Sequence, residues 1–193
     1  MDRADLLSLL DQYVDRHRDE AETVGRIRDL VTRHENCFDR DCFPGHVTAS
    51  AWIVSLESGA VLLTHHRKLD RWLQLGGHTD GETDVLAAAL REAEEESGLR
   101  AFQPVPGAET PMILDVDVHR IPARGSEPTH EHHDIRFLLR VSEAQAIRRQ
   151  QSESKAVRWF PGPGIEARLV EESLRRMARK ADLWLSRDPI GPG

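Results

Sequence analysis

Hydrophobic side chains recur with two different periods along this chain. Between Leu6 and about Thr32 they return at steps of three and four residues, which predicts helix. From His46 the pattern changes to short β-rich stretches, interrupted by a helical stretch near residues 84–97. Glu166 to Ser186 is helical again and strongly amphipathic. The pattern therefore predicts an N-terminal helical extension, a strand-rich centre and a C-terminal helix.

The strand-rich centre begins with a predicted hairpin, in which residues 47–56 and 60–69 flank a Glu57–Ser58–Gly59 turn. The segment 122–133 is rich in Pro, Gly, Ser and His, so we expect an exposed, mobile loop that can border a site. The tail 188–193 is expected to be loose. Further strands are expected near residues 101–105, 112–121, 134–141 and 156–160.

These elements predict an α/β fold with a mixed sheet on which the 84–97 helix packs. We divide the chain into a helical extension (1–44), a central domain (45–162), and a C-terminal helix with its tail (163–193). The apolar stripe of the extension must cover either the flank of the central domain or a second subunit. A homodimer is therefore one of two expectations for this segment.

Composition narrows the function classes. The chain has 193 residues, 39% hydrophobic and 31% charged, which suits one soluble globular domain with an extension. Its net charge of −7 argues against general nucleic-acid binding and against binding to anionic membranes. No apolar run is long enough to span a bilayer and the first residues lack a signal-peptide pattern, so a cytoplasmic protein is expected.

The two cysteines, Cys37 and Cys42, are open to more than one interpretation. They could form a disulfide or a metal pair, but cysteines in a cytosolic protein usually stay reduced. Each precedes a phenylalanine in a repeated Cys-Phe unit. We therefore expect them to be small buried residues.

The helix near residues 84–97 carries the most specific chemistry. Thr83 is expected to cap it and Gly98 to end it. Leu86, Leu90, Ala93 and Ser97 fall on the stripe that would bury. Glu92, Glu95 and Glu96 project from a different arc, three or four residues apart. Carboxylates so close repel each other unless a cation sits among them, so we expect a hard divalent ion, Mg²⁺ or Mn²⁺.

The stretch Arg91-Glu92-Ala93-Glu94-Glu95-Glu96-Ser97-Gly98-Leu99 resembles the second half of the Nudix box, REUxEExGU, and Gly77 stands at the family's distance before Arg91. The resemblance implies a Nudix-like α/β/α sandwich over about residues 45–162. One position departs from the pattern, because Thr83 stands where the family has a glutamate, between Glu82 and Asp84. The alternative for this stretch is an acidic helix face that is merely solvated.

Histidines form a second constellation. The spacing His130-x-His132 puts two imidazoles on one side of an extended backbone, and neutral imidazole is a common ligand of transition metals. The pattern is similar to the metal site of isopentenyl-diphosphate isomerase, a protein with the Nudix fold, at His46, His78, His130 and His132. That resemblance implies a transition-metal site distinct from the glutamates, although the isomerase's catalytic cysteine is replaced by Gly76. Exposed loop histidines or phosphate contacts are the alternative.

Further residues are candidates for substrate contact. Arg67, Lys68 and Arg71 follow the predicted hairpin and could hold phosphate oxygens, although a solvated strand end would look the same. His133 is a candidate general base or substrate contact from the 122–133 loop. Gly77 can approach a phosphate or metal closely because it has no side chain.

The expected function follows from the acidic helix. We predict a metal-dependent hydrolase that cleaves the phosphoanhydride of a nucleoside diphosphate linked to another group. Glu92, Glu95 and Glu96 would hold the Mg²⁺ or Mn²⁺, and Arg91 would orient Glu95 as an ion pair. Two alternatives stay open. One is an isomerase-like enzyme acting on a prenyl diphosphate, and the other is a non-catalytic Nudix module that binds a nucleotide.

Overall fold

The computed structural model describes residues 1–107, 109, 111–125, 127–150, 152 and 154–187. Eight strands form one mixed sheet in which β1 and β7 run parallel and the other pairs are antiparallel. The strands are β1 (Gly45–Ser55), β2 (Val61–His66), β3 (Arg71–Leu73), β4 (Leu75–His78), β5 (Gln103–Pro104), β6 (Asp115–Ile121), β7 (His130–Val141) and β8 (Ser154–Phe160). The expected tail at residues 188–193 lies outside the described residues.

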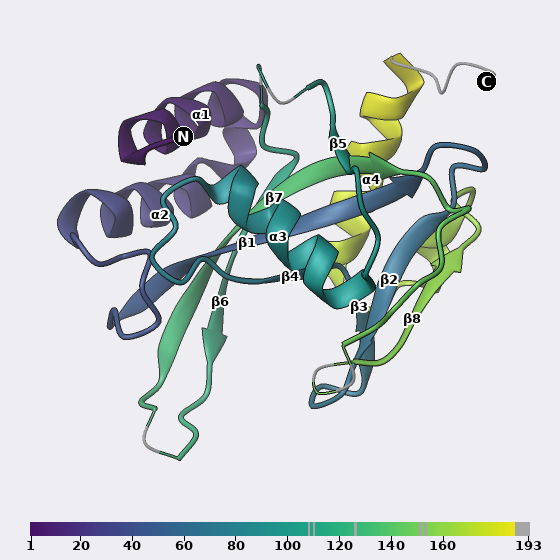
Figure 1. Cartoon of the computed structure of the whole chain (residues 1–193). Coiled ribbons are helices and arrows are strands. Elements are labelled where there is room, and N and C mark those ends of the chain that lie inside the picture. Colours follow the sequence, from purple (N-terminus) through teal and green to yellow (C-terminus); the bar gives the residue numbers. More distant parts are fainter. Residues whose placement is uncertain (108, 110, 126, 151, 153, 188–193) are drawn as a thin grey trace.

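The central strand β1 supplies side chains to both faces of the sheet. Val47, Ala49 and Ala51 enter a core shared with α1 (Arg3–Arg16), α2 (Ala21–Arg33) and α3 (Val85–Ser97). Trp52 and Val54 face the other way, toward η2 (Ile165–Arg168) and α4 (Glu172–Arg187). Because successive strand residues point to opposite faces, β1 builds both cores. Figure 1 shows α3 across the front of the sheet and α4 behind it, which confirms the predicted α/β/α sandwich.

The N-terminal extension packs on the domain's own sheet. Asp2 caps α1, where its carboxylate accepts hydrogen bonds from the amides of Ala4 and Asp5. A short helix, η1 (Arg18–Glu20), turns the chain into α2. Leu10 and Ile27, which carry the apolar stripe of the two helices, are fully buried in the shared core. Of the two expectations for this stripe, the flank of the domain is the one observed. The boundaries 1–44, 45–162 and 163–193 and a homodimer stay predictions.

A buried ionic cluster joins the extension to α4. Lys180 of α4 donates to the Tyr13 hydroxyl (2.5 Å) and to Asp115 of β6 (2.6 Å). Arg176, one turn earlier, donates to both oxygens of Asp115 at 2.8 and 3.0 Å. Glu20 of η1 accepts from the Tyr13 hydroxyl and from Lys180. Each buried charge has oppositely charged partners, which is the condition under which a folded chain tolerates it.

Several predicted boundaries were wrong. β7 begins at His130, so the expected mobile loop is shorter and His130 to His133 lie in a strand that pairs with both β1 and β6. Asp84, not Thr83, caps α3, because its carboxylate accepts from the Ala87 amide. The C-terminal helix is interrupted, with η2 ending at Arg168 and α4 beginning at Glu172. The strands near 101–105 and 112–121 are shorter, at Gln103–Pro104 and Asp115–Ile121.

Two remaining expectations concern the cysteines and the membrane. Cys37 and Cys42 are buried free thiols, as predicted. Burial raises the pKa of Cys37 to about 11, so this thiol stays protonated near neutral pH. Among the described residues, no helix combines the length and the apolar character needed to cross a bilayer.

Candidate active site

Glu92, Glu95 and Glu96 of α3 form an acidic arc on the helix. This acidic arc packs against the glycines of β4. Glu92 and Glu96 are only 8% and 5% exposed, whereas the Glu95 side chain is 53% exposed. Glu96 accepts a hydrogen bond from the Gly76 amide (3.2 Å). Two of the three carboxylates are therefore buried, although the sequence placed them on a different arc from the predicted apolar stripe. Strand β4 covers this arc because its glycines present no side chains to the helix.

The Gly76–Gly77 pair makes this close approach possible. A Cβ atom on Gly77 would lie 2.4 Å from Oε2 of Glu92. Gly76 has a φ of +152°, and its Cβ would lie 2.2 Å from the Cβ of Ser50 on β1. A side chain at Gly76 would clash with the backbone of β1, and one at Gly77 would displace the Glu92 carboxylate, since unbonded heavy atoms do not approach so closely.

Arg91 holds the acidic helix to the strand. Its guanidinium donates to Oε1 of Glu92 (2.7 Å) and to the carbonyl oxygen of His78 (2.8 Å). The predicted partner Glu95 lies 3.6 Å away. Burial lowers the pKa of Arg91, but Glu92 and Glu95 outweigh this and raise it, so the guanidinium stays charged.

Thr83, the residue that departs from the Nudix box, contacts the N-terminal extension. Thr83 donates to the carbonyl oxygen of Met1 (3.4 Å). Its acidic neighbours are engaged in the turn, where Glu82 accepts from the Asp84 amide and Asp84 pairs with the amino group of Met1. Arg91 therefore takes the His78 carbonyl and Glu92 as partners in place of a glutamate at position 83.

The donor set of this arc fits a hard divalent cation. It consists of carboxylate oxygens from one helix beside backbone that glycine leaves uncovered. Mg²⁺ and Mn²⁺ prefer oxygen ligands and bind through a small number of carboxylates shared with substrate phosphates. Glu92, Glu95 and Glu96 are the residues that would hold such an ion.

The pleat of β4 separates the acidic site from the histidines. Gly77 lies opposite Ala49 of β1 and faces α3, whereas His78 lies opposite Thr48 and faces the other side of the sheet. On that side His46 of β1 pairs in register with His132 of β7. The two candidate sites thus share one strand but occupy opposite faces, since neighbouring side chains alternate.

The predicted histidines do come together on this face. Ligand atoms of His46, His130 and His132 all lie within 4.8 Å of one another. The His78 ring centroid is 5.1 Å from those of His46 and His132. A fifth ring, His119 of β6, lies 5.4 Å from His132 and was missed by the sequence reasoning. Only the β6–β7 register, which sets His119 opposite His132, reveals it.

Three rings of the cluster, His46, His78 and His132, are uncharged at neutral pH. Burial, reinforced by the neighbouring imidazoles, lowers the pKa of His132 to about 2. Burial also lowers the pKa of His78 to about 4, with Arg40 adding to the effect, and lowers the pKa of His46. Neutral imidazoles have a free nitrogen lone pair, which is the form that binds a metal.

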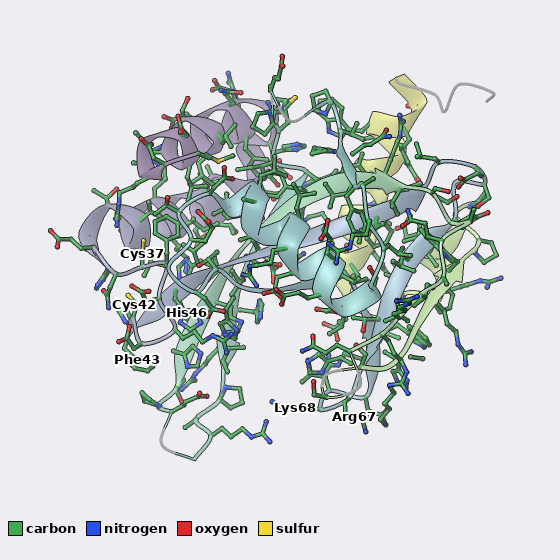
Figure 2. All side chains as sticks on the ribbon, viewed as in Figure 1. Cys37, Cys42, Phe43, His46, Arg67 and Lys68 are labelled. Carbon is green, nitrogen blue, oxygen red and sulfur yellow. The ribbon has the colours of Figure 1, made fainter. Side chains whose placement is uncertain are left out.

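The other predicted contacts lie apart from the histidine cluster. His133 points to the opposite face, where it is buried opposite Val47 and lies 3.5 Å from Glu131. Arg67 and Lys68 are exposed on the β2–β3 turn, away from His46 in Figure 2. Arg71 is paired with Glu171. The roles of these residues in substrate binding stay predictions.

A second buried network lies between the histidines and the apolar core. Asp134 accepts hydrogen bonds from Thr48 (3.0 Å), Ser50 (2.8 Å) and Arg136 (2.8 Å). Arg136, which is 2% exposed, also donates to Asp115 (3.1 Å). These bonds occupy the Asp134 carboxylate and give it a structural role in this chain.

Comparisons with known proteins agree with the fold. A family model described as a NUDIX domain matches residues 44–180. An Ap4A hydrolase binary complex from C. elegans is similar, with 16% identity, 73% of this chain and 98% of that chain covered, and a TM-score of 0.57. A NUDIX-family hydrolase from Clostridium perfringens has 25% identity, coverage of 72% and 97%, and a TM-score of 0.51. The E. coli dihydroneopterin triphosphate pyrophosphohydrolase has 18% identity, coverage of 69% and 92%, and a TM-score of 0.53.

No curated protein matches this chain. The family model nevertheless covers well over half of it, so the chain belongs to the Nudix family. Its enzyme class is that of the Nudix pyrophosphohydrolases, which act on phosphoanhydrides.

Proposed function

We propose that this protein is a divalent-metal-dependent pyrophosphohydrolase that cleaves a nucleoside diphosphate linked to another group. The observation that carries the proposal is the contact between the acidic arc of α3 and Gly77, where any side chain would displace the Glu92 carboxylate. Two structural neighbours are named for their action on Ap4A and on dihydroneopterin triphosphate, and both names describe phosphoanhydride chemistry. The nucleoside diphosphate core is the inference from the sequence, and the attached group is open.

The carboxylates are proposed to hold Mg²⁺ or Mn²⁺. A bound divalent ion supplies positive charge against the diphosphate oxygens and lowers the pKa of coordinated water. Glu95 is the solvent-facing member of the set, whereas Glu92 and Glu96 are fixed by Arg91 and by the Gly76 amide. This arrangement orients two carboxylates before any ligand arrives.

Arg91 is proposed as a positioning residue. It ties Glu92 to the His78 carbonyl, and thereby holds α3 against β4 at the acidic site. Gly77, Arg67, Lys68, Arg71 and His133 remain the proposed substrate contacts. Exposed Arg67 and Lys68 suit phosphate oxygens, because arginine gives forked contacts and lysine gives point-like ones.

Two alternatives are less well supported. An isomerase-like enzyme acting on a prenyl diphosphate needs an acid-base group at position 76, and Gly76 has no space for any side chain beside Ser50. Failure to consume isopentenyl diphosphate removes this alternative. A binding module that does not turn over its ligand rests on Thr83, but the carboxylates and Arg91 form a complete set without a glutamate there. A small-molecule partner, the absence of general nucleic-acid or membrane binding, and a cytoplasmic location stay predictions.

The test is a hydrolysis screen with Mg²⁺ or Mn²⁺ against nucleoside triphosphates, sugar nucleotides, dinucleoside polyphosphates and dinucleotide cofactors. Glu95→Gln and Glu96→Gln are run beside Glu94→Gln, a control on the same helix whose carboxylate pairs with Arg100. We expect one class of compound to be hydrolysed, with activity lost in the first two variants and kept in the control. Binding without turnover would favour the non-catalytic module. Equal activity in all three variants would remove the acidic arc from catalysis.

A further inference from the structure

The histidine cluster has features that packing alone does not explain. His46 is 2% exposed, and neither of its ring nitrogens has a hydrogen-bond partner among the described residues, although the Cys42 backbone lies near the ring. A buried imidazole without partners loses the hydrogen bonds that it makes in water. Such an imidazole is stabilised when another group occupies one of its nitrogens.

The surrounding rings point to what that group is. Ligand atoms of His130 and His132 lie within 4.8 Å of each other and of a His46 nitrogen. The His46 ring stacks on His130 at 5.0 Å and lies 4.8 Å from His132. Imidazoles from two paired strands thus converge on one point, and a single ion placed there would be within reach of each.

Hydrogen bonds outside the cluster set the tautomers that a metal ligand needs. Nδ1 of His130 lies 2.9 Å from the carbonyl oxygen of Pro128, an acceptor that requires this nitrogen to carry the proton. The other nitrogen, Nε2, is then the one with a free lone pair. Metal-ligating histidines commonly bond a backbone carbonyl or a carboxylate through the second ring nitrogen. His119 has a similar outer contact, because its Nδ1 lies 3.1 Å from a carboxylate oxygen of Asp117.

We propose that His46, His130 and His132, with His78 as the fourth ligand, form a transition-metal site on the face of the sheet opposite the acidic arc. The centroid of the His78 ring, from β4, lies 5.1 Å from the ring centroids of His46 and His132. It thus adds a third strand to the two that supply the other ligands. The donor set consists of imidazoles without a carboxylate. Imidazole suits Zn²⁺, Co²⁺, Ni²⁺ and Fe²⁺, whereas Mg²⁺ prefers oxygen. His119 flanks the site, with its ring centroid 5.4 Å from that of His132.

This proposal goes beyond the hydrolase function and does not depend on it. The acidic arc and the histidines lie on opposite faces of β4, so each set can be altered separately. The site also differs in metal selectivity from the acidic arc, because the two donor sets prefer different ions. A metal-binding measurement therefore tests the histidines without any substrate.

The experiment uses the full chain, stripped of metal with a chelator, and titrates it with Co²⁺ in the presence of excess Mg²⁺. We expect one equivalent of Co²⁺ to bind with the visible d–d absorption of nitrogen ligands, and Zn²⁺ to displace it. His46→Ala and His132→Ala should abolish this spectrum. His34→Ala, which alters a histidine at the end of α2 outside the cluster, should keep it. Glu95→Gln and Glu96→Gln should also keep it, even if they abolish hydrolysis.

Three results would overturn the proposal: no Co²⁺ spectrum in the parent chain, an unchanged spectrum in both histidine variants, or displacement of Co²⁺ by Mg²⁺. Circular dichroism of each variant checks the fold. His132 is less buried than His46, so His132→Asn is the second variant if His46→Ala does not fold. A shift of the melting temperature by Zn²⁺ in the parent chain and in His34→Ala, but not in His132→Asn, supports the site independently of absorption.

Discussion

Gly77 and Glu92 meet where a Cβ atom would lie 2.4 Å from the carboxylate oxygen Oε2. This contact brings the acidic arc of α3 against strand β4, and it explains why the carboxylates of Glu92 and Glu96 are buried although three acidic side chains share one arc. Other contacts of the acidic site depend on this approach, including the bond from Arg91 to the His78 carbonyl.

Gly77→Ala should reduce the rate of hydrolysis about 100-fold without unfolding the chain. The new methyl group would displace Glu92, and a misplacement of about 1 Å can reduce the rate about 100-fold. The measurement is kcat for the substrate found in the screen. Gly25→Ala is the control, because a Cβ there meets nothing within 4 Å. Parent-like kcat in Gly77→Ala would mean that Glu92 is not needed in its observed place.

Arg91→Lys should reduce kcat more than it changes KM. The lysine keeps the positive charge but cannot donate to Glu92 and the His78 carbonyl in the same forked arrangement. We expect a loss of about tenfold or more, equivalent to about 1.4 kcal/mol of transition-state stabilisation. Arg100→Lys, three residues beyond the end of the same helix, should have no such effect because its partner is Glu94. Full activity in Arg91→Lys would show that charge alone suffices.

Arg136→Met should destabilise the fold strongly. Arg136 is 2% exposed and bonds Asp134 and Asp115, so its removal leaves buried carboxylates with fewer partners. Breaking a buried ion pair costs about 3–5 kcal/mol in the free energy of unfolding. Urea unfolding measures the change. Arg120→Met, at an exposed position of β6, is the control and should stay within about 0.5 kcal/mol of the parent. Equal effects of the two substitutions would contradict the structural role of the Arg136 network.

Acid should lower the free energy of unfolding through protonation of Asp117. Burial raises the pKa of this carboxyl, but the hydrogen bond to His119 and the charges of Arg136 and Arg176 outweigh burial and lower the pKa from 3.8 to about 2. The unfolded chain therefore binds this proton first as the pH falls. The stabilisation is present above pH 3.8 and is lost between 3.8 and about 2, by up to about 2 kcal/mol.

The free energy of unfolding, measured by urea titration across that pH interval, checks this sign. Asp117→Asn removes the titrating group, so its stability should fall less steeply with acid than that of the parent. Glu143→Gln, which alters a half-buried carboxylate that accepts from the Ser58 hydroxyl outside this network, should fall as steeply as the parent. An identical pH slope in Asp117→Asn and the parent would assign the acid sensitivity to other groups.

Leu10→Ala should show that the N-terminal helices belong to the same cooperative fold. Leu10 is fully buried in the core shared with the sheet, and replacement of a buried leucine by alanine costs about 2–5 kcal/mol. We expect a single unfolding transition at lower urea, measured by both tryptophan fluorescence and circular dichroism. Leu183→Ala is the control, since Leu183 is 60% exposed. Two separate transitions, with only the first shifted, would show that the extension folds on its own.

The parts of the site that sequence predicted correctly are those that depend on local spacing. The helix near residues 84–97 follows from apolar steps of three and four and from Gly98, which has a positive φ and ends the helix as expected. The grouping of Glu92, Glu95 and Glu96 follows from helical geometry. The i, i+2 spacing placed His130 and His132 on the same side of a strand.

Tertiary structure decided which side chains are buried and which strands lie side by side. The burial of Glu92 and Glu96 depends on β4, which is distant in the chain from their helix turn and contacts it only after folding. His119 lies in the histidine cluster because the β6–β7 register sets it opposite His132. His133 lies on the other face of the sheet because successive residues of β7 point to opposite faces. A periodic pattern specifies a face within one element, but the partner of that face is chosen by packing between elements that no local pattern encodes.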